Sequence, residues 1–380
     1  MQKLGLYLHI PFCVRKCHYC DFYSAPSGKG ARAAYVRALS RHLAVAAGEV
    51  QDFSVDTVYF GGGTPTLLTG AELHELLDAV RTHYAMEPDA EITVECNPVT
   101  AAEGLMKELR TAGFNRLSIG LQSVHDSELQ LLGRPHDYAA FLETYKAARR
   151  AGFANVSVDL MFGIPGQTVQ SFSHTVDTLL ALSPEHISAY GLRIEEGTPF
   201  YRMQPTLTLP DEDAETEMAE LVAQRLTAAG YEHYEISNYA RPGKRSRHNM
   251  RYWLGADYLG FGPGAHSYLH GTRFETAPDR GAYLAAVEQG SFATLRQNAS
   301  VIAGKEKMDE YVMLRMRLFE GLDLQDFTSR FGITFREEYG DVTPLIKGGF
   351  LTCTNGRLAF TEGGMRVSNA ILSEWLDFGK

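Results

Sequence analysis

The chain has 380 residues, of which 44% are apolar and 22% are charged, and this globular composition excludes wholesale disorder. The formal net charge of −10 argues against general nucleic-acid binding, and no apolar run is long enough to predict a transmembrane helix. The start of the chain lacks the pattern of a signal peptide, and five cysteines, an odd number, argue against a disulfide framework, so we expect a cytoplasmic protein that meets membranes only through partners.

Hydrophobic periodicity predicts short apolar strands that alternate with amphipathic helices, as in a parallel β/α protein. The predicted strands cover 4–9, 57–60, 92–95, 116–120, 156–161 and 187–190, with a further candidate at 232–237. Helices are predicted at 31–47, 71–83 and 141–150. Ala-Gly-aromatic triplets at 112–114, 151–153 and 229–231 follow helices, and their glycines can end a helix in the left-handed conformation. We therefore predict an α/β fold, a partial (β/α)6 barrel with its functional groups at the carboxyl ends of the strands.

The sequence changes character in its last third. We divide the chain into a barrel at 1–238, a basic and glycine-rich linker at 239–303 and a C-terminal module at 304–380. In the module, helices surround a predicted hairpin at 350–360 with Asn-Gly at its turn, and a final helix ends near Leu376, as in a winged-helix-like module. The module carries 10 basic and 12 acidic side chains, which argues against DNA binding.

Three cysteines lie close together directly after the first predicted strand. Cys13, Cys17 and Cys20 are spaced by four and three residues, and three soft thiolates at this spacing suit a metal ion or an iron–sulfur cluster. Three thiolates leave one iron of a [4Fe–4S] cluster open to bind a substrate. The alternative is a zinc site, which needs a fourth ligand such as His18 or Cys96. The two remaining cysteines, Cys96 and Cys353, are expected to be buried as small apolar residues.

The CxxxCxxC spacing, followed after the second strand by Gly-Gly-Gly-Thr-Pro at 61–65, resembles the radical S-adenosylmethionine (SAM) superfamily. The resemblance implies a partial (β/α)6 barrel that holds a [4Fe–4S] cluster, with SAM bound to the open iron. The segments LHIPFC, CHYCDFYS, GGGTPT, ECNP, SIGLQS and DLMFGIPGQT resemble the coproporphyrinogen dehydrogenase-like group of this superfamily. By this resemblance, the residues at SAM-contacting positions are Tyr7, Gly62, Gly63, Thr64, Glu95, Gln122, Arg134 and Asp159.

These residue types suit a nucleoside that carries an amino acid. Glycines let backbone carbonyls approach the methionine ammonium group, and Glu95 can accept hydrogen bonds from both ribose hydroxyls. Gln122, Arg134 and Asp159 can supply amide, guanidinium and carboxylate contacts. The alternative explanation of the glycines is a tight turn. The alternative explanation of Arg134 is a surface ion pair. Asp159 lies between apolar residues, which disfavours a solvated position.

Two departures from the dehydrogenases point to one branch of the group. The dehydrogenases have a further cysteine where this chain has Phe22, and an N-terminal extension where this chain has six residues before Tyr7. Both departures resemble the HemW haem chaperones. The segment His248-Asn-Met-Arg-Tyr-Trp253 resembles the HNxxYW motif that those chaperones use for haem, which implies haem ligation by His248 with the side chains of Asn249, Tyr252 and Trp253 around it.

Nearby side chains extend this haem prediction. The basic residues expected to meet the haem propionates are Arg241, Lys244, Arg245, Arg247 and Arg251. His266 is a second candidate ligand. A solvated basic loop and a Tyr-Trp pair in the core are the corresponding alternatives.

The resemblance implies a haem chaperone that passes haem to apo-haemoproteins, membrane-bound respiratory ones included. The sequence leaves open whether the chain forms a homodimer. No nucleic-acid partner is expected. The alternative is an enzyme, such as an oxygen-independent coproporphyrinogen III dehydrogenase, in which a reduced cluster cleaves SAM. A non-enzymatic zinc or nucleic-acid module is the third hypothesis.

Overall fold

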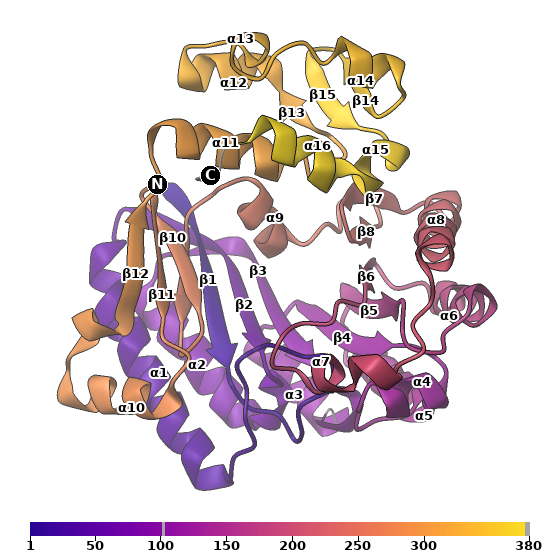
Figure 1. The fold of residues 1–380 in the computed structure, drawn as a ribbon. Coiled ribbons are helices and arrows are strands. Elements are labelled where there is room, and N and C mark those ends of the chain that lie inside the picture. Colours follow the sequence, from indigo (N-terminus) through magenta and orange to yellow (C-terminus); the bar gives the residue numbers. More distant parts are fainter. Residues whose placement is uncertain (101–102, 377–380) are drawn as a thin grey trace.

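The computed structural model describes residues 1–100 and 103–376, and most of these form one α/β body (Figure 1). Twelve of the described strands form a single sheet in the order β12-β11-β10-β9-β1-β2-β3-β4-β5-β6-β8-β7. Its middle part is parallel and follows the chain order, which is the predicted architecture. These strands are β1 Gln2–Ile10, β2 Phe53–Gly62, β3 Met86–Cys96, β4 Arg116–Gln122, β5 Val156–Phe162 and β6 His186–Gly191.

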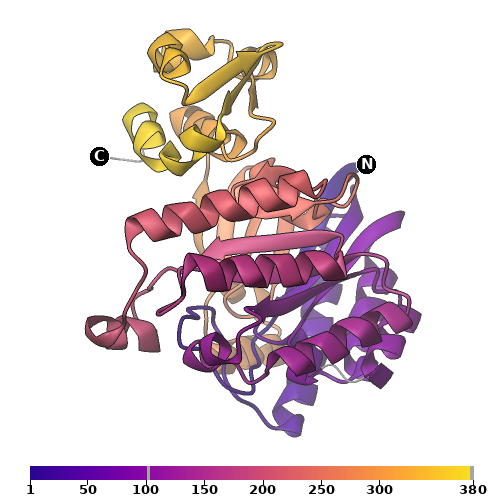
Figure 2. The same cartoon turned by 90° about the vertical axis from the view of Figure 1, so that its right-hand side faces the viewer.

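Helices follow the parallel strands, and most of them cover the outer face of the sheet, whereas the short α7 Pro199–Met203 packs on the cysteine-bearing loop after β1. The helices are α1 Lys29–Ala46, α2 Gly70–His83, α3 Glu103–Ala112, α4 Asp126–Leu131, α5 Tyr138–Arg150, α6 Val169–Leu182, α7 and α8 Glu212–Ala228, with short 3-10 turns η1 Ala47–Glu49, η2 Pro65–Leu67, η3 Pro98–Thr100 and η4 Gln204–Thr206. Helices α6 and α8 lie side by side on one flank (Figure 2). The predicted α/β fold with a parallel sheet is confirmed.

Alternation along the strands separates an apolar face from a polar one. In β1, Leu6 and Leu8 are fully buried in the core shared with the helices, whereas Tyr7 and His9 point to the opposite, inner face. The inner face of the barrel therefore carries polar and aromatic side chains. The Ala-Gly-aromatic triplets also behave as predicted, since Gly113 and Gly152 have φ values of 104° and 89° and the aromatic residue after each is buried.

Residues 239–303, predicted as a linker, contain strands of the main sheet. Strand β9 Tyr258–Phe261 pairs parallel to β1, and β10 His266–Leu269, β11 Thr272–Thr276 and β12 Arg296–Val301 continue the sheet antiparallel. The segment also holds α9 Arg247–Trp253, α10 Arg280–Gln289 and the 3-10 turn η5 Phe292–Leu295. The division of the chain into domains otherwise stays a prediction.

The candidate strand at 232–237 is a hairpin instead. Strands β7 Glu232–Glu235 and β8 Asn238–Ala240 pair with each other, and β8 runs antiparallel to β6. A short turn can only reverse the chain, because a parallel strand needs a crossover of many residues. The sheet thus stays open beyond β6, and the barrel is partial.

The C-terminal module has its own apolar core and lies over α9 and the β7–β8 hairpin (Figure 1). Its elements are α11 Gly304–Arg315, β13 Leu322–Asp323, α12 Leu324–Phe331, α13 Phe335–Tyr339, α14 Thr343–Lys347, β14 Leu351–Thr354, β15 Arg357–Phe360, α15 Glu362–Arg366 and α16 Ser368–Trp375. The predicted hairpin is confirmed, with positive φ at Asn355 and Gly356. The predicted burial of Cys353 is wrong, because its side chain lies on the exposed face of β14. Residues after Leu376 lie outside the described part of the chain.

None of the helices in residues 1–100 and 103–376 has the length and apolar content needed to cross a membrane.

Candidate cofactor site

The three cysteines of the predicted triad line one cavity. They lie on the loop after β1, where that loop reaches the carboxyl ends of the neighbouring strands, and the cavity has a volume of about 930 Å³. Cys13 Sγ lies 3.7 Å from the hydroxyl of Thr64, and Cys17 Sγ accepts a hydrogen bond of 3.6 Å from Arg134. All three thiols are free of disulfides. The loop therefore presents three sulfur ligands to a single space.

The environment of the triad bears on which group it can bind. Burial raises the pKa of Cys20 to about 11, and the thiols of Cys17 and Cys13 add to that effect. Binding of a cation must therefore displace the proton of Cys20. A cluster spaces its thiolates further apart than a single ion does, because each thiolate binds a different iron.

The zinc alternative finds little support in this geometry. Within the described part of the chain, no three His, Cys, Asp or Glu side chains are grouped to hold a single metal ion. His18, one of the proposed fourth ligands, has Nδ1 at 2.8 Å from the carbonyl of Leu131 and packs its ring near Gly133. Cys96 is buried as predicted.

The glycine-rich loop after β2 closes one side of the cavity. Gly62 has a φ of 105°, and a Cβ there would lie 2.4 Å from the ring of His9. A Cβ on Gly63 would lie 2.6 Å from the carbonyl oxygen of Phe12. These glycines are therefore required by the protein's own packing against β1 and the triad loop, in addition to any role toward a ligand.

Glu95 lies at the carboxyl end of β3 and points into the cavity. Its Oε1 accepts a hydrogen bond of 2.9 Å from the Tyr59 hydroxyl, and its Oε2 accepts one of 3.1 Å from the Gly62 amide. Burial raises the pKa of Glu95 to about 7, although both hydrogen bonds favour the charged form. Tyr7 lies below, on the inner face of β1, with its ring stacked on that of Tyr59 at 6.1 Å. The carboxylate of Glu95 is therefore held in a defined orientation at the carboxyl end of β3.

We expect the raised pKa of Glu95 to appear in the pH dependence of stability. A carboxyl group with a higher pKa in the folded chain binds its proton more tightly when folded. Its stabilising contribution is therefore full below pH 4.5 and is lost as the pH rises through about 7, a difference of about 3 kcal/mol. Denaturant unfolding of the cofactor-free protein between pH 5 and pH 8 measures this slope.

The variant Glu95→Gln should lose this contribution to the slope. Burial also raises the pKa of Glu235 to about 7, so Glu235→Gln serves as the matched variant with a site away from the triad. If the stability of Glu95→Gln depended on pH as steeply as that of the wild type, the assignment of the raised pKa to Glu95 would be contradicted.

The other predicted SAM contacts also reach this cavity. Gln122 ends β4 with a φ of 74°, and Asp159 accepts a 3.4 Å hydrogen bond from Ser118, while burial raises its pKa. Arg134 donates to the carbonyl of Gly120 at 2.8 Å as well as to Cys17, so the surface ion pair considered for it is not formed. The predicted SAM-contacting residues that line the cavity are Gly62, Gly63, Thr64, Glu95, Gln122, Arg134 and Asp159, and Asn249 of the predicted haem motif lines it as well.

Sequence reasoning missed a buried arginine in the same cavity. Arg116 begins β4 and is 1% exposed, and its charge lowers the pKa of both Glu95 and Asp159 after larger effects of burial and hydrogen bonding. Its Nε has no hydrogen-bond partner among the described residues. A lone arginine at the start of an otherwise apolar strand was the available signal.

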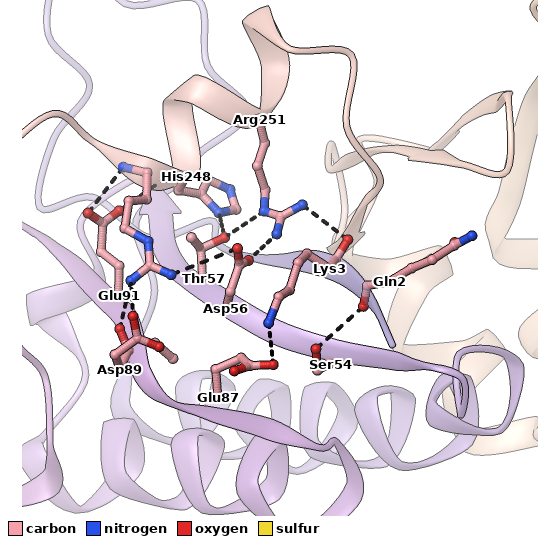
Figure 3. Close-up of polar contacts among 12 residues, drawn as sticks. Gln2, Lys3, Ser54, Asp56, Thr57, Glu87, Asp89, Glu91, His248 and Arg251 are labelled. Atoms are coloured by element: carbon pink, nitrogen blue, oxygen red, sulfur yellow. Dashed lines mark hydrogen bonds and ion pairs between the residues drawn. The ribbon is translucent and has the colours of Figure 1, made fainter.

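Helix α9 carries the predicted haem motif and closes the barrel from the amino ends of the strands (Figure 3). His248 is 1% exposed, with Nδ1 at 2.9 Å from the Thr57 hydroxyl and Nε2 at 2.9 Å from the Tyr252 hydroxyl. Its ring stacks on that of Tyr59 at 5.2 Å, and Tyr59 in turn donates to Glu95. Burial lowers the pKa of His248 to about 3, so the ring is neutral. Trp253 ends the helix and is half-buried.

The basic residues around this motif are largely engaged with the protein itself. Arg251 is buried, pairs with Asp56 and donates to Thr57 and to the carbonyl of Lys3 (Figure 3). It also donates to the carbonyl of Asp257. Arg247 pairs with Asp89, Arg245 pairs with Glu232 and Glu320, and Arg241 stacks on Tyr231. His266 is exposed and lies 3.4 Å from Glu275. These contacts fasten α9 and its flanks to the barrel.

A partial β/α barrel with three cysteines after its first strand defines the class of radical SAM proteins, and a family model described as the radical SAM superfamily matches residues 7–179. A second model, the HemN C-terminal domain, matches residues 302–367. Heme chaperone HemW of Mycobacterium tuberculosis is 37% identical over 98% of this chain and 94% of its own length, and HemW of Escherichia coli is 36% identical over 99% of both. The chain therefore belongs to the HemW family of haem chaperones.

A solved structure, coproporphyrinogen III oxidase (HemN) from Escherichia coli, described as a radical SAM enzyme, has the same fold. It superposes with a TM-score of 0.86 at 23% identity, over 99% of this chain and 91% of that one. The predicted superfamily, group and branch are thus confirmed.

Proposed function

We propose that this protein is a haem chaperone that carries a [4Fe–4S] cluster and SAM, binds haem and delivers it to apo-haemoproteins. The observation that carries this proposal is the similarity to HemW haem chaperones over nearly the whole chain. We place the protein in the cytoplasm, where it would meet membrane-bound haemoproteins as partners. Phe22, 63% exposed, stands where the dehydrogenases have their further cysteine, which favours the chaperone over the enzyme.

The donor set fits the proposed cofactors. Cys13, Cys17 and Cys20 would hold the cluster, which supplies an open iron for SAM and, when reduced, an electron for cleavage of a C–S bond. The guanidinium of Arg134 lies at Cys17 Sγ and would offset the negative charge of that thiolate. Tyr59 and the Gly62 amide hold the two oxygens of Glu95, each of which keeps a lone pair for a ribose hydroxyl.

Haem ligation by His248 stays a prediction, and it has a structural requirement. Both ring nitrogens of His248 already have partners, so one of Thr57 and Tyr252 would have to give up its hydrogen bond to free a nitrogen for iron. The ring is buried, so α9 would also have to move away from β2. Haem binding at this motif therefore predicts a conformational change of α9.

An anaerobic preparation with reconstituted cluster tests the proposal. We expect stoichiometric haem uptake in a spectroscopic titration, and transfer of that haem to an apo-haemoprotein after mixing. The same preparation is incubated with SAM and reductant, and 5′-deoxyadenosine is measured. Absence of haem uptake by the wild-type protein would reject the chaperone.

The alternative enzyme is tested in parallel, because the fold is that of coproporphyrinogen III oxidase. Coproporphyrinogen and reductant are added under the same anaerobic conditions. Formation of the decarboxylated product would overturn the chaperone in favour of the enzyme.

A further inference from the structure

The cavity extends well beyond the residues assigned to the cluster and SAM. Its far part is lined by the end of β6, by the β7–β8 turn and by the C-terminal module, through residues that include Tyr190, Ile236 and Asn369. The total volume of about 930 Å³ lies near the upper end of the range of about 300–1,000 Å³ for small-molecule sites. A site of this size has room for a second ligand beside a nucleoside.

Two guanidinium groups converge on this far part without carboxylate partners. Arg193, on the segment after β6, is exposed, and it has no hydrogen bond or ion pair with any residue in the described ranges. Arg317, from the C-terminal module, donates to Ser368 Oγ at 2.6 Å and to Asn369 Oδ1 at 2.5 Å, both neutral groups. Burial and the nearby charge of Arg193 lower the pKa of Arg317. Two positive charges near each other, neither paired with a carboxylate in the described part of the chain, favour an anionic ligand between them.

The position of Arg193 is set by its neighbours. Leu192 and Ile194 pack with Tyr19 of the triad loop in a small apolar cluster. The intervening side chain of Arg193 lines the cavity. The arginine therefore lies between the triad and the C-terminal module.

The same cavity has exposed apolar walls. Val14 and Phe22 of the triad loop are 54% and 63% exposed, and Tyr190 and Ile236 are 40% and 39% exposed. Exposed apolar side chains gathered around one concavity indicate a binding surface for an apolar ligand. These residues come from separate elements, so only the folded chain brings them together.

We propose that this far part of the cavity binds a tetrapyrrole dicarboxylate, with its carboxylates on Arg193 and Arg317 and its ring against the apolar wall. The combination of a large apolar face with two cationic groups matches a flat, hydrophobic dianion. Asp21, Glu195, Glu215 and Glu362 also line the cavity, so the pair of arginines, and not the net charge of the wall, carries this assignment. The inference rests on the proposed function and gives haem a site beside the cofactors, away from the buried ring of His248.

The test uses metal-free protoporphyrin IX, which has both carboxylates but no iron for a histidine to ligate. Binding to the reconstituted protein is followed by porphyrin fluorescence, with the dimethyl ester as a probe that lacks the anionic groups. We expect Arg193→Ala to weaken protoporphyrin binding about tenfold, the usual effect of losing one charge-assisted contact, and Arg193→Glu to weaken it further. The ester should bind weakly and equally to all variants.

Further variants separate ligand contact from folding. Arg317→Lys keeps the charge but loses the paired contacts to Ser368 and Asn369, and Arg336→Ala changes an exposed arginine elsewhere in the module. The first should weaken binding, and the second should leave it unchanged. Thermal unfolding of each variant verifies that the fold is retained.

The outcomes distinguish this site from the proposed function. Equal protoporphyrin affinity in wild type, Arg193→Ala and Arg193→Glu would overturn the site. Wild-type protein that takes up haem but not protoporphyrin would also overturn it, while leaving the chaperone intact. Wild-type protein that takes up neither would reject both.

Discussion

Replacing any one of Cys13, Cys17 and Cys20 with alanine is expected to remove nearly all cluster iron from the reconstituted protein. The three thiols face one cavity, and a cluster that already leaves one iron open for SAM has no spare protein ligand. Losing one thiolate leaves two irons without protein ligands, so the cluster should fail to assemble or be lost. Iron and sulfide analysis, together with the visible absorption of the reconstituted protein, measures the effect.

The two remaining cysteines provide matched controls. Cys353→Ala changes an exposed thiol on β14, and Cys96→Ala changes a buried thiol near the same cavity. Both variants should retain iron at the wild-type level. Loss of iron in Cys96→Ala with retention in Cys20→Ala would mean that a different set of thiols binds the metal.

The second large effect is expected at His248. In the absence of haem, His248→Ala should lower the free energy of unfolding by about 3 kcal/mol, since it removes two buried hydrogen bonds and leaves a cavity. The partners left behind are the hydroxyls of Thr57 and Tyr252, and the lost ring also supports Tyr59. Denaturant unfolding of the cofactor-free protein measures the difference.

This result decides how haem titrations of His248 variants are interpreted. Tyr59 donates to Glu95, so a disturbed ring stack should also weaken SAM binding, whereas a pure haem ligand would leave SAM binding unchanged. His266→Ala, at an exposed histidine, is the control and should alter neither stability nor SAM affinity. Unchanged stability of His248→Ala without haem would contradict the structural role and favour ligation alone.

Local sequence patterns predicted the first half of the fold well. Each strand from β1 to β6 contains its predicted segment, because buried parallel strands are short apolar runs with helices between them. The strands β9–β12 were missed, because they pair with segments far away in the chain. β9, for example, pairs with β1, which lies about 250 residues earlier in the chain, and the sequence of β9 does not indicate which strand it pairs with.

The basic residues of α9 show the same limit. Their sequence resembles a solvated basic loop, yet Arg251 is buried and pairs with Asp56 (Figure 3). Arg247 stays partly exposed and pairs with Asp89, which is exposed. A charge can be buried only with a partner, and here each partner lies on a strand early in the chain. The alternative of a solvated loop is therefore excluded for Arg251.

The cofactor half of the site followed from the sequence, because cysteine spacing and the residues that end parallel strands are local properties that the barrel brings to one edge. The surroundings of His248, the hairpin that leaves the barrel open and the approach of Arg193 to Arg317 depend on packing between distant segments. Burial, dielectric environment and the balance of charge arise only when those segments meet. Only the tertiary structure therefore shows them.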